Sequence, residues 1–195
     1  MFTDWHTLLG TFSSIALLAL IYPYTQGVLH GSTRPNVVSW VGWCFLFAIA
    51  TAIQLSKGAS WSVVVPLIST ISTGIIALLA VRYKHVQFTK LDYFCMLMGL
   101  AALGLWLFAD QPIVSLLLII GADFFVTIPT VVKIYHSPKT EPFFLWAVYT
   151  IVAGLSIAAS TKFDIYNLLD PVYTVLGSAV ITLLALRGKI AKDRA

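Results

Sequence analysis

Hydrophobic residues along the chain gather in seven long runs separated by short polar segments. The runs cover residues 8–28, 36–55, 60–81, 91–109, 112–134, 142–160 and 166–186. A helix needs about 20 apolar residues to cross the hydrocarbon core of a bilayer. Backbone polar groups in that core must be hydrogen-bonded within the segment. The pattern therefore predicts an all-α membrane protein with seven transmembrane helices.

The composition agrees with a lipid environment. Hydrophobic residues make up 59% of the 195 residues, charged residues only 10%, and the mean hydropathy is +0.91. About a quarter of the residues of an average soluble domain are charged. The net charge of +4 does not indicate a nucleic-acid partner, because the basic residues are scattered at the ends of the apolar runs. We therefore expect the lipid bilayer, and no nucleic acid, as a partner.

The lysines and arginines predict an orientation. With the N-terminus outside, ten of the twelve fall on the cytoplasmic side: Arg34, Arg82, Lys84, Lys90, Lys133, Lys139, Arg187, Lys189, Lys192 and Arg194. Only Lys57 and Lys162 fall outside. Because cytoplasmic loops carry the excess of basic residues, this predicts an outside N-terminus and a cytoplasmic C-terminus. The first run has no basic segment before it, so we expect a retained membrane helix and not a signal peptide. We see no long tail or targeting extension in the sequence, and we expect a multi-pass protein of a prokaryotic inner (plasma) membrane.

Two parts of the chain repeat the same residues at a nearly constant spacing. At a shift of 106 residues, Pro23, His30 and Trp40 match Pro129, His136 and Trp146. Residues 61–84 match residues 166–189 at a shift of 105, with seven of 24 positions identical. Unrelated apolar segments of this length would share roughly two or three positions by composition. The chain therefore contains two related halves.

Each half holds three predicted helices, and the run 91–109 has no counterpart. Two three-helix units joined directly would point in opposite directions in the membrane, whereas one extra helix between them makes them parallel. The sequence therefore predicts a 3+1+3 arrangement with a pseudo-twofold axis along the membrane normal. Residues 1–84 form the first three-helix repeat, residues 85–110 hold the linker helix, and residues 111–195 form the second repeat with a cytoplasmic tail.

This arrangement, with a proline late in the first helix of each repeat, resembles the PQ-loop and SWEET superfamily of membrane transporters. The resemblance covers nearly the whole chain and implies two parallel three-helix bundles. The family motif is typically Pro-Gln; here the segments read PYTQ at Pro23–Gln26 and PTVV at Pro129–Val132. Sugar-carrying members typically place an Asn in the third helix of each repeat. The run 60–81 has none, and Asn167 stands at the outer end of the last run.

Asp123 is the residue that most favours a transport function. It lies inside the fifth run, between LLLIIGA and FFVTIPT. A carboxylate in hydrocarbon is energetically unfavourable, so such residues usually face a cavity and mark an ion or substrate path. Thr127 and Thr130 follow at helical spacing on the same face. We interpret Asp123 as a site for a proton or a cationic group; the alternative is a structural acid hydrogen-bonded to neighbouring helices.

Small polar residues recur on one face of the third and seventh runs. Ser62, Ser69 and Thr73 correspond to Asn167, Thr174 and Ser178, and Asp170 stands where the first repeat has Val65. These residues favour a polar path through the centre of the protein. The alternatives are that Ser and Thr join membrane helices, and that Asp170, which precedes Pro171, caps the start of a helix.

Pro23 and Pro129 lie inside predicted helices, where proline removes a backbone hydrogen bond and produces a kink. Their matching positions favour hinges, with Gln26 as part of the first motif. The alternative is ordinary membrane prolines, which are common.

Trp40 and Trp146 begin the second helix of each repeat at the predicted cytoplasmic interface. An aromatic belt accounts for that position, and a gate is the alternative role. His30 and His136 are expected at the same interface, either as residues at helix ends or as pH-sensitive gates.

These features together predict a small-solute transporter that works by alternating access, with its site between the repeats near the midplane. The expected substrate is an amino acid or another small polar metabolite, with protons as a coupling ion. The alternatives are a SWEET-like sugar facilitator and a ligand-binding receptor or sensor on the same fold. We expect neither an enzyme nor a cofactor or metal, because no catalytic or metal-binding motif is present. The sequence leaves open whether the chain forms a homo-oligomer.

Overall fold

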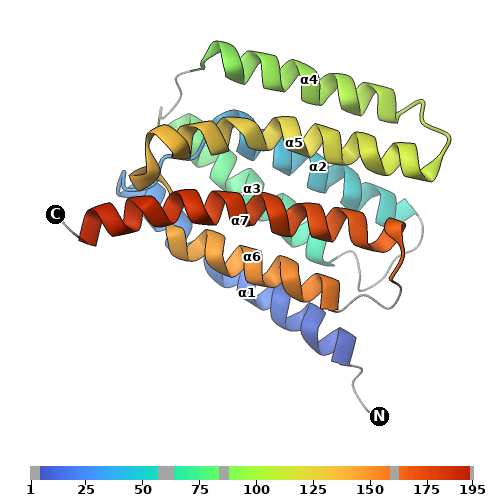
Figure 1. The fold of residues 1–195 in the computed structure, drawn as a ribbon, viewed down its shortest axis with the longest axis horizontal. Coiled ribbons are helices and arrows are strands. Elements are labelled where there is room, and N and C mark those ends of the chain that lie inside the picture. Colours follow the sequence, from blue (N-terminus) through green and yellow to red (C-terminus); the bar gives the residue numbers. More distant parts are fainter. Residues whose placement is uncertain (1–4, 57–63, 84–87, 159–162, 194–195) are drawn as a thin grey trace.

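The computed structural model describes residues 5–56, 64–83, 88–158 and 163–193. Within these ranges the chain forms seven α-helices and a short 3₁₀ helix. They are α1 (Trp5–Leu29), α2 (Val37–Ser56), α3 (Val64–Arg82), α4 (Lys90–Trp106), α5 (Pro112–His136), η2 (Pro138–Thr140), α6 (Phe143–Ala158) and α7 (Ile165–Asp193). Figure 1 shows the α-helices lying along one another, with α4 at the edge beside α5. The all-helical prediction is confirmed.

Two helix ends illustrate how the helices differ from the predicted runs. Helix α4 ends at Trp106, before the apolar run ends at residue 109. Helix α7 continues to Asp193, about two turns beyond residue 186. The last residues of α7 are too polar for hydrocarbon, but Lys, Ala and Arg favour helix, so the helix outlasts the apolar run. Hydrophobic length therefore predicts where a membrane segment ends and not where the helix ends.

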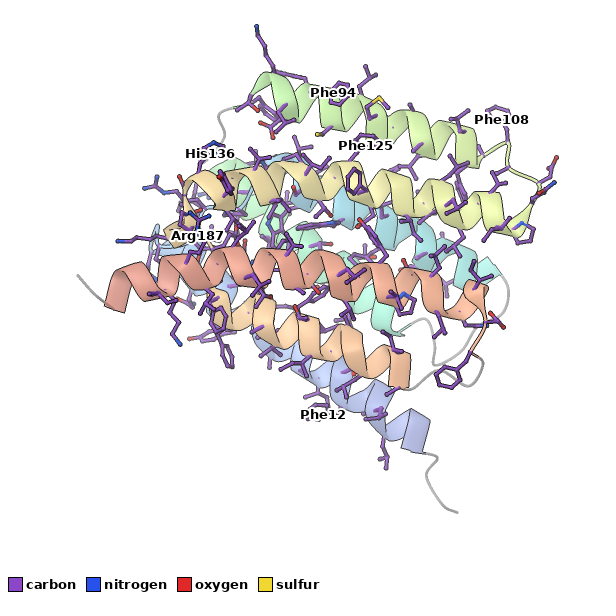
Figure 2. All side chains as sticks on the ribbon, viewed as in Figure 1. Phe12, Phe94, Phe108, Phe125, His136 and Arg187 are labelled. Atoms are coloured by element: carbon purple, nitrogen blue, oxygen red, sulfur yellow. The ribbon has the colours of Figure 1, made fainter. Side chains whose placement is uncertain are left out.

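Several helices have the length and apolar character of membrane spans. In the described chain, three segments are long and apolar enough to cross a bilayer: Thr11–Leu29, Pro112–His136 and Asn167–Ile190. Three shorter apolar segments are Val37–Ala52, Pro66–Arg82 and Phe143–Leu155. Large apolar side chains cover the outside: Phe12, Phe94 and Phe108 are 60%, 54% and 83% exposed and project from the bundle in Figure 2. Such a surface fits lipid better than water.

Local hydrogen bonds explain where α2 and α4 begin. The Thr89 hydroxyl accepts a hydrogen bond from the Asp92 backbone N–H, and the Asp92 carboxylate accepts one from the Thr89 N–H at 2.7 Å. This reciprocal cap satisfies two N–H groups at the start of α4. The Asn36 side chain accepts from the Ser39 N–H at the start of α2 and donates to Asp92 at 2.9 Å. Asn36 and Asp92 therefore cap the starts of α2 and α4, and the hydrogen bond between them connects the two helices.

Six of the helices form a closed ring. Helix α3 packs between α1 and α2, and α7 packs between α5 and α6. The two groups meet where α2 packs on α5 and where α1 packs on α6. The order around the ring is therefore α1, α3, α2, α5, α7, α6. Helix α4 lies outside the ring, mainly against α5 (Figure 1).

The close approach of α7 to η2 depends on Gly188. A methyl group on Gly188 would overlap the backbone carbonyl of Pro138. We expect Gly188→Ala to destabilise the protein by about 1–3 kcal/mol, because a tight backbone contact cannot accept an added methyl group. Gly104→Ala is the matched control, since nothing lies within 4 Å of a methyl group there. The thermal unfolding midpoint in detergent measures both variants; equal midpoints would contradict the packing described.

Candidate functional site

The two ends of the helices differ in charge. One end gathers the C-termini of α1, α3, α5 and α7 and the N-termini of α2, α4 and α6. Arg34, Arg82, Lys90, Lys133 and Lys139 lie at this end, which we call the basic end. The sequence assigned these residues to one side of the membrane, and the described helices bring them to one end of the bundle.

The two repeat tryptophans meet inside the ring near the basic end. Trp40 and Trp146 are only 6% and 5% exposed, and their ring centroids are 6.4 Å apart. Trp43 lies 5.3 Å from Trp40 and 5.9 Å from Trp146, and Tyr24 lies 4.9 Å from Trp40. The aromatic-belt interpretation was therefore wrong: both side chains turn inward and are buried against each other. We call Tyr24, Trp40, Trp43 and Trp146 the aromatic cluster.

Aliphatic residues from matching positions surround the aromatic cluster. Val28 and Ile134 are fully buried and are related by the 106-residue shift. Ile76 and Ile181 are 3% and 2% exposed and are related by the 105-residue shift. All four belong to one hydrophobic core with the aromatic cluster. Equivalent residues from both halves therefore fill the ring interior toward the basic end.

A buried carboxylate stands beside this core. Glu141 accepts hydrogen bonds from the Tyr24 hydroxyl at 3.0 Å and from the Trp146 indole N–H at 3.1 Å. It also forms an ion pair with Lys133, whose ammonium group donates to the backbone carbonyl of Arg34. The Glu141 side chain is fully buried, and that of Lys133 is 20% exposed. A buried charge needs such partners, because desolvation without them is strongly unfavourable.

Sequence reasoning missed this group of residues, which we call the Glu141 cluster (Tyr24, Lys133, Glu141 and Trp146). Glu141 lies in a polar loop segment, where a charged residue is ordinary. Its bond to Tyr24 joins residues 117 positions apart. Repeat comparison gives no signal either, because Glu141 matches Pro35 and Lys133 matches Gly27.

Asp123 lies near the middle of α5 and faces the ring interior. Its carboxylate accepts hydrogen bonds from the Tyr173 hydroxyl of α7 at 2.7 Å and from the Thr127 hydroxyl at 3.3 Å. The indole of Trp43 on α2 and the carboxylate of Asp170 on α7 also lie near the Asp123 carboxylate. The sequence predicted that Thr127 lies on the same helix face as Asp123, and the two side chains are hydrogen-bonded. The bond from Tyr173 on α7 is a contact of the kind that the alternative interpretation, an acid hydrogen-bonded to neighbouring helices, expects. Thr130 on the same face is fully buried, and its hydroxyl has no hydrogen-bond partner within the described residues.

Asp170 and Asn167 have different surroundings from those expected. Helix α7 begins at Ile165, so Asp170 and Pro171 lie inside it and Asp170 is not an N-cap. Asp164 makes the capping contact instead, accepting from the Asn167 backbone N–H at 3.0 Å and from its side chain at 2.8 Å. Asn167 is exposed at this helix start. The apolar run from residue 166 predicted the start of α7 within one residue, whereas the N-cap interpretation of Asp170 was wrong because Pro171 lies inside the helix and does not mark its start.

Two of the predicted path residues, Thr73 of α3 and Ser178 of α7, donate hydrogen bonds within their own helices. The buried Thr73 donates to the Ser69 carbonyl at 2.6 Å. The buried Ser178 donates to the Thr174 carbonyl at 2.7 Å. Ser69 and Thr174 are half-buried, and Ser62 lies outside the described residues. Their positions match between the halves, but these bonds alone fit helix packing as well as a lined path.

The two prolines and two histidines occupy parallel positions with one difference. Pro23 is inside α1 and exposed, whereas Pro129 is inside α5 and buried, on the helix against which α4 packs. His30 Nδ1 contacts the Gln26 carbonyl at 2.7 Å, and His136 Nδ1 contacts the Val132 carbonyl at 2.9 Å. Both histidines are exposed at helix ends, as the interfacial interpretation expects.

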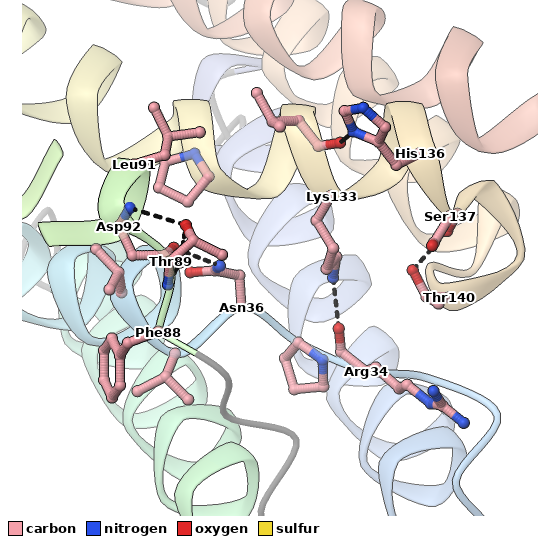
Figure 3. Close-up of a pocket in the computed structure, with 15 residues that line it drawn as sticks. Arg34, Asn36, Phe88, Thr89, Leu91, Asp92, Lys133, His136, Ser137 and Thr140 are labelled. Atoms are coloured by element: carbon pink, nitrogen blue, oxygen red, sulfur yellow. Dashed lines mark hydrogen bonds between the residues drawn. The ribbon is translucent and has the colours of Figure 1, made fainter. Parts of the chain in front are cut away.

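A cavity of about 520 Å³ lies at the basic end, outside the ring. It opens between the starts of α2 and α4 and the end of α5, as Figure 3 shows. Its lining includes Asn36, Asp92, Lys133, His136 and Pro129. The Asp92 carboxylate on the wall of this cavity accepts hydrogen bonds from Asn36 and Thr89. Its role is therefore to cap the start of α4 and to bind Asn36 at the start of α2. We place the candidate site at Asp123, because that carboxylate faces the interior and not the rim.

Comparison with protein-family models, curated proteins and solved structures finds no match to this chain. The geometry therefore carries the functional argument. Among the described residues, no group of three His, Cys, Asp or Glu side chains is placed to hold a metal ion. The interior offers instead a carboxylate with hydroxyl donors and aromatic neighbours, which is suited to binding a proton or a cationic group.

The Tyr173–Asp123 bond is directly testable. We expect Tyr173→Phe to lower the free energy of unfolding by about 1.5–3 kcal/mol, because a hydrogen bond to a charged group is lost. Tyr22→Phe is the control, since Tyr22 is 70% exposed. Chemical denaturation in mild detergent measures both. A Tyr173→Phe protein as stable as the control would show that the hydroxyl does not hold the carboxylate.

Proposed function

We propose that this protein is a membrane-spanning small-solute transporter that works by alternating access. The observation that carries the proposal is Asp123, a carboxylate at mid-helix that faces the inside of a six-helix ring. Toward the basic end, the ring interior is filled by the aromatic cluster and its aliphatic neighbours. A titratable group behind a packed barrier is the arrangement that an alternating-access site requires.

The proposed architecture is 3+1+3, with α4 as the linker between two parallel three-helix repeats. Its support is the pattern of packing: α3 sits between α1 and α2 as α7 sits between α5 and α6. Between the halves, α1 packs on α6 and α2 packs on α5. When α1 is matched with α5 and α2 with α6, each of these two contacts becomes the other. This is the pattern expected of a pseudo-twofold axis, and it favours the resemblance to the PQ-loop and SWEET superfamily.

The proposed substrate is an amino acid or another small amine-bearing metabolite, with protons as coupling ion. Asp123 would bind the proton or the cationic group, because its carboxylate already accepts hydrogen bonds from Tyr173 and Thr127. Trp43 and Tyr149 stand near the same charge, and aromatic faces stabilise organic cations.

Uptake into proteoliposomes tests the transport proposal. With an imposed proton gradient, we expect gradient-driven uptake of at least one amine-bearing solute from a panel of amino acids, amines and sugars. Asp123→Asn should abolish the response to the gradient, because the amide cannot exchange a proton. Asp110→Asn is the control, since Asp110 is exposed at the turn before α5. Sugar uptake that both variants retain would favour a facilitator, and ligand binding without any uptake would favour a receptor.

The proposed topology places the basic end in the cytoplasm. We expect green fluorescent protein fused after Ala195 to fluoresce in cells, because it folds in the cytoplasm. The same reporter fused before Met1 and exported should stay dark, whereas alkaline phosphatase at that position should be active. The reverse pattern would contradict the orientation drawn from the lysines and arginines.

A further inference from the structure

The Glu141 cluster connects the two halves of the chain at the basic end. Tyr24 belongs to α1, Lys133 to α5, and Glu141 precedes α6. Helices α1 and α5 are not neighbours in the ring, so Glu141 joins elements that no direct helix packing joins. Through Lys133 the cluster also reaches the carbonyl of Arg34 in the loop before α2.

A backbone contact reinforces this connection. The Arg34 N–H donates to the Thr140 carbonyl at 2.9 Å. Residues 34 and 140 are equivalent positions of the two repeats, related by the 106-residue shift. The two loops at the basic end therefore touch at matching points, and Lys133 and Glu141 stand beside that contact. Separating the halves at this end would break three bonds together: the backbone bond, the Lys133 bond to the Arg34 carbonyl and the Tyr24 bond to Glu141. The Lys133–Glu141 ion pair lies within the second half.

The aromatic cluster also contains a group that favours separation. The indole N–H of Trp146 donates to Glu141, but that of Trp40 has no hydrogen-bond partner within the described residues. The difference follows from the sequence, since the first repeat has Pro35 where the second has Glu141. A buried, unpartnered donor is destabilising and gains a partner when water or solute reaches it. The closed end is therefore opposed by Trp40 and needs an interaction that holds it.

We propose that Glu141 is the latch of the basic end. It accepts the Tyr24 hydrogen bond from the first half, and its ion pair positions Lys133 to donate to the Arg34 carbonyl of the first half. These two bonds hold the ring closed there, and their release opens the interior toward that side. This inference rests on the proposed alternating access and adds a positioning residue to it. The latch is one-sided, because both charged partners belong to the second half.

The test measures opening without any substrate. In a background with Cys44→Ala and Cys95→Ala, a Val28→Cys probe reports access to the closed end, because Val28 is fully buried in that core. An Ala122→Cys probe is the control: Ala122 is fully buried and its carbonyl lies beside Gly99 of α4. The readout is the alkylation rate with a membrane-impermeant maleimide in nanodiscs.

We expect Glu141→Gln to raise the Val28→Cys alkylation rate by about tenfold or more, since a charge-assisted bond is lost. The Ala122→Cys rate should stay unchanged. Lys133→Gln and Tyr24→Phe each affect one of the two bonds that cross between the halves, so each should give a smaller increase than Glu141→Gln, which affects both. These two variants also carry the test if Glu141→Gln does not fold.

Two results would overturn the latch. One is an unchanged Val28→Cys rate in folded Glu141→Gln and Lys133→Gln proteins. The other is an equal rise at Ala122→Cys, which would mean general loosening of the structure. The assay needs no solute, so it separates the two proposals. If Glu141→Gln raises only the Val28→Cys rate and the protein transports no solute in proteoliposomes, transport would be rejected and the role of Glu141 would still be supported.

Discussion

An ionised carboxylate surrounded by apolar side chains must be supplied with hydrogen-bond donors, and this requirement organises the interior of the protein. Three acids receive such donors, each at a place where helices meet. Asp92 joins the start of α4 to the start of α2, Asp123 joins α5 to α7, and Glu141 joins α1 to α5 and α6. The outer surface of the described helices is covered mainly by large apolar side chains. Polar chemistry is therefore confined to the ring interior and to the helix ends.

The two halves share a framework but not its charged chemistry. The buried aliphatic residues of the core pair across the repeat, as Val28 with Ile134 and Ile76 with Ile181. The acids have no such partners: Asp123 matches Leu17 and Glu141 matches Pro35. In the proposed mechanism, the duplicated scaffold provides two halves that move against each other. The acids of the second half would then supply the proton-binding group and the residue that holds one end closed.

The sequence predicts the framework well because apolar runs and repeat spacing are local or periodic signals. The helical class followed from the apolar runs, and the shared helix face of Asp123 and Thr127 followed from their four-residue spacing. The end of α7 was missed because polar helix formers prolong a helix beyond its apolar part. Trp40 and Trp146 were assigned to a belt because their depth is visible in the sequence, but the side of the helix that packs inward is not.

The partners of the acids could not be predicted for a related reason. Tyr173 meets Asp123 from 50 residues away, and Tyr24 meets Glu141 from 117 residues away. Each contact depends on which helices are neighbours in the ring, and that order is set by tertiary packing. A tyrosine in an apolar run carries no mark that distinguishes a donor to a buried acid from a lipid-facing side chain such as Tyr22.

A distance measurement between the halves tests alternating access most directly. Spin labels at Leu29 and Tyr135, which are equivalent positions at the basic ends of α1 and α5 and are 42% and 58% exposed, would report the separation of the repeats in nanodiscs. The account predicts two distance populations whose ratio changes with pH and differs in Asp123→Asn. A single population that stays fixed across pH and in Asp123→Asn would contradict it.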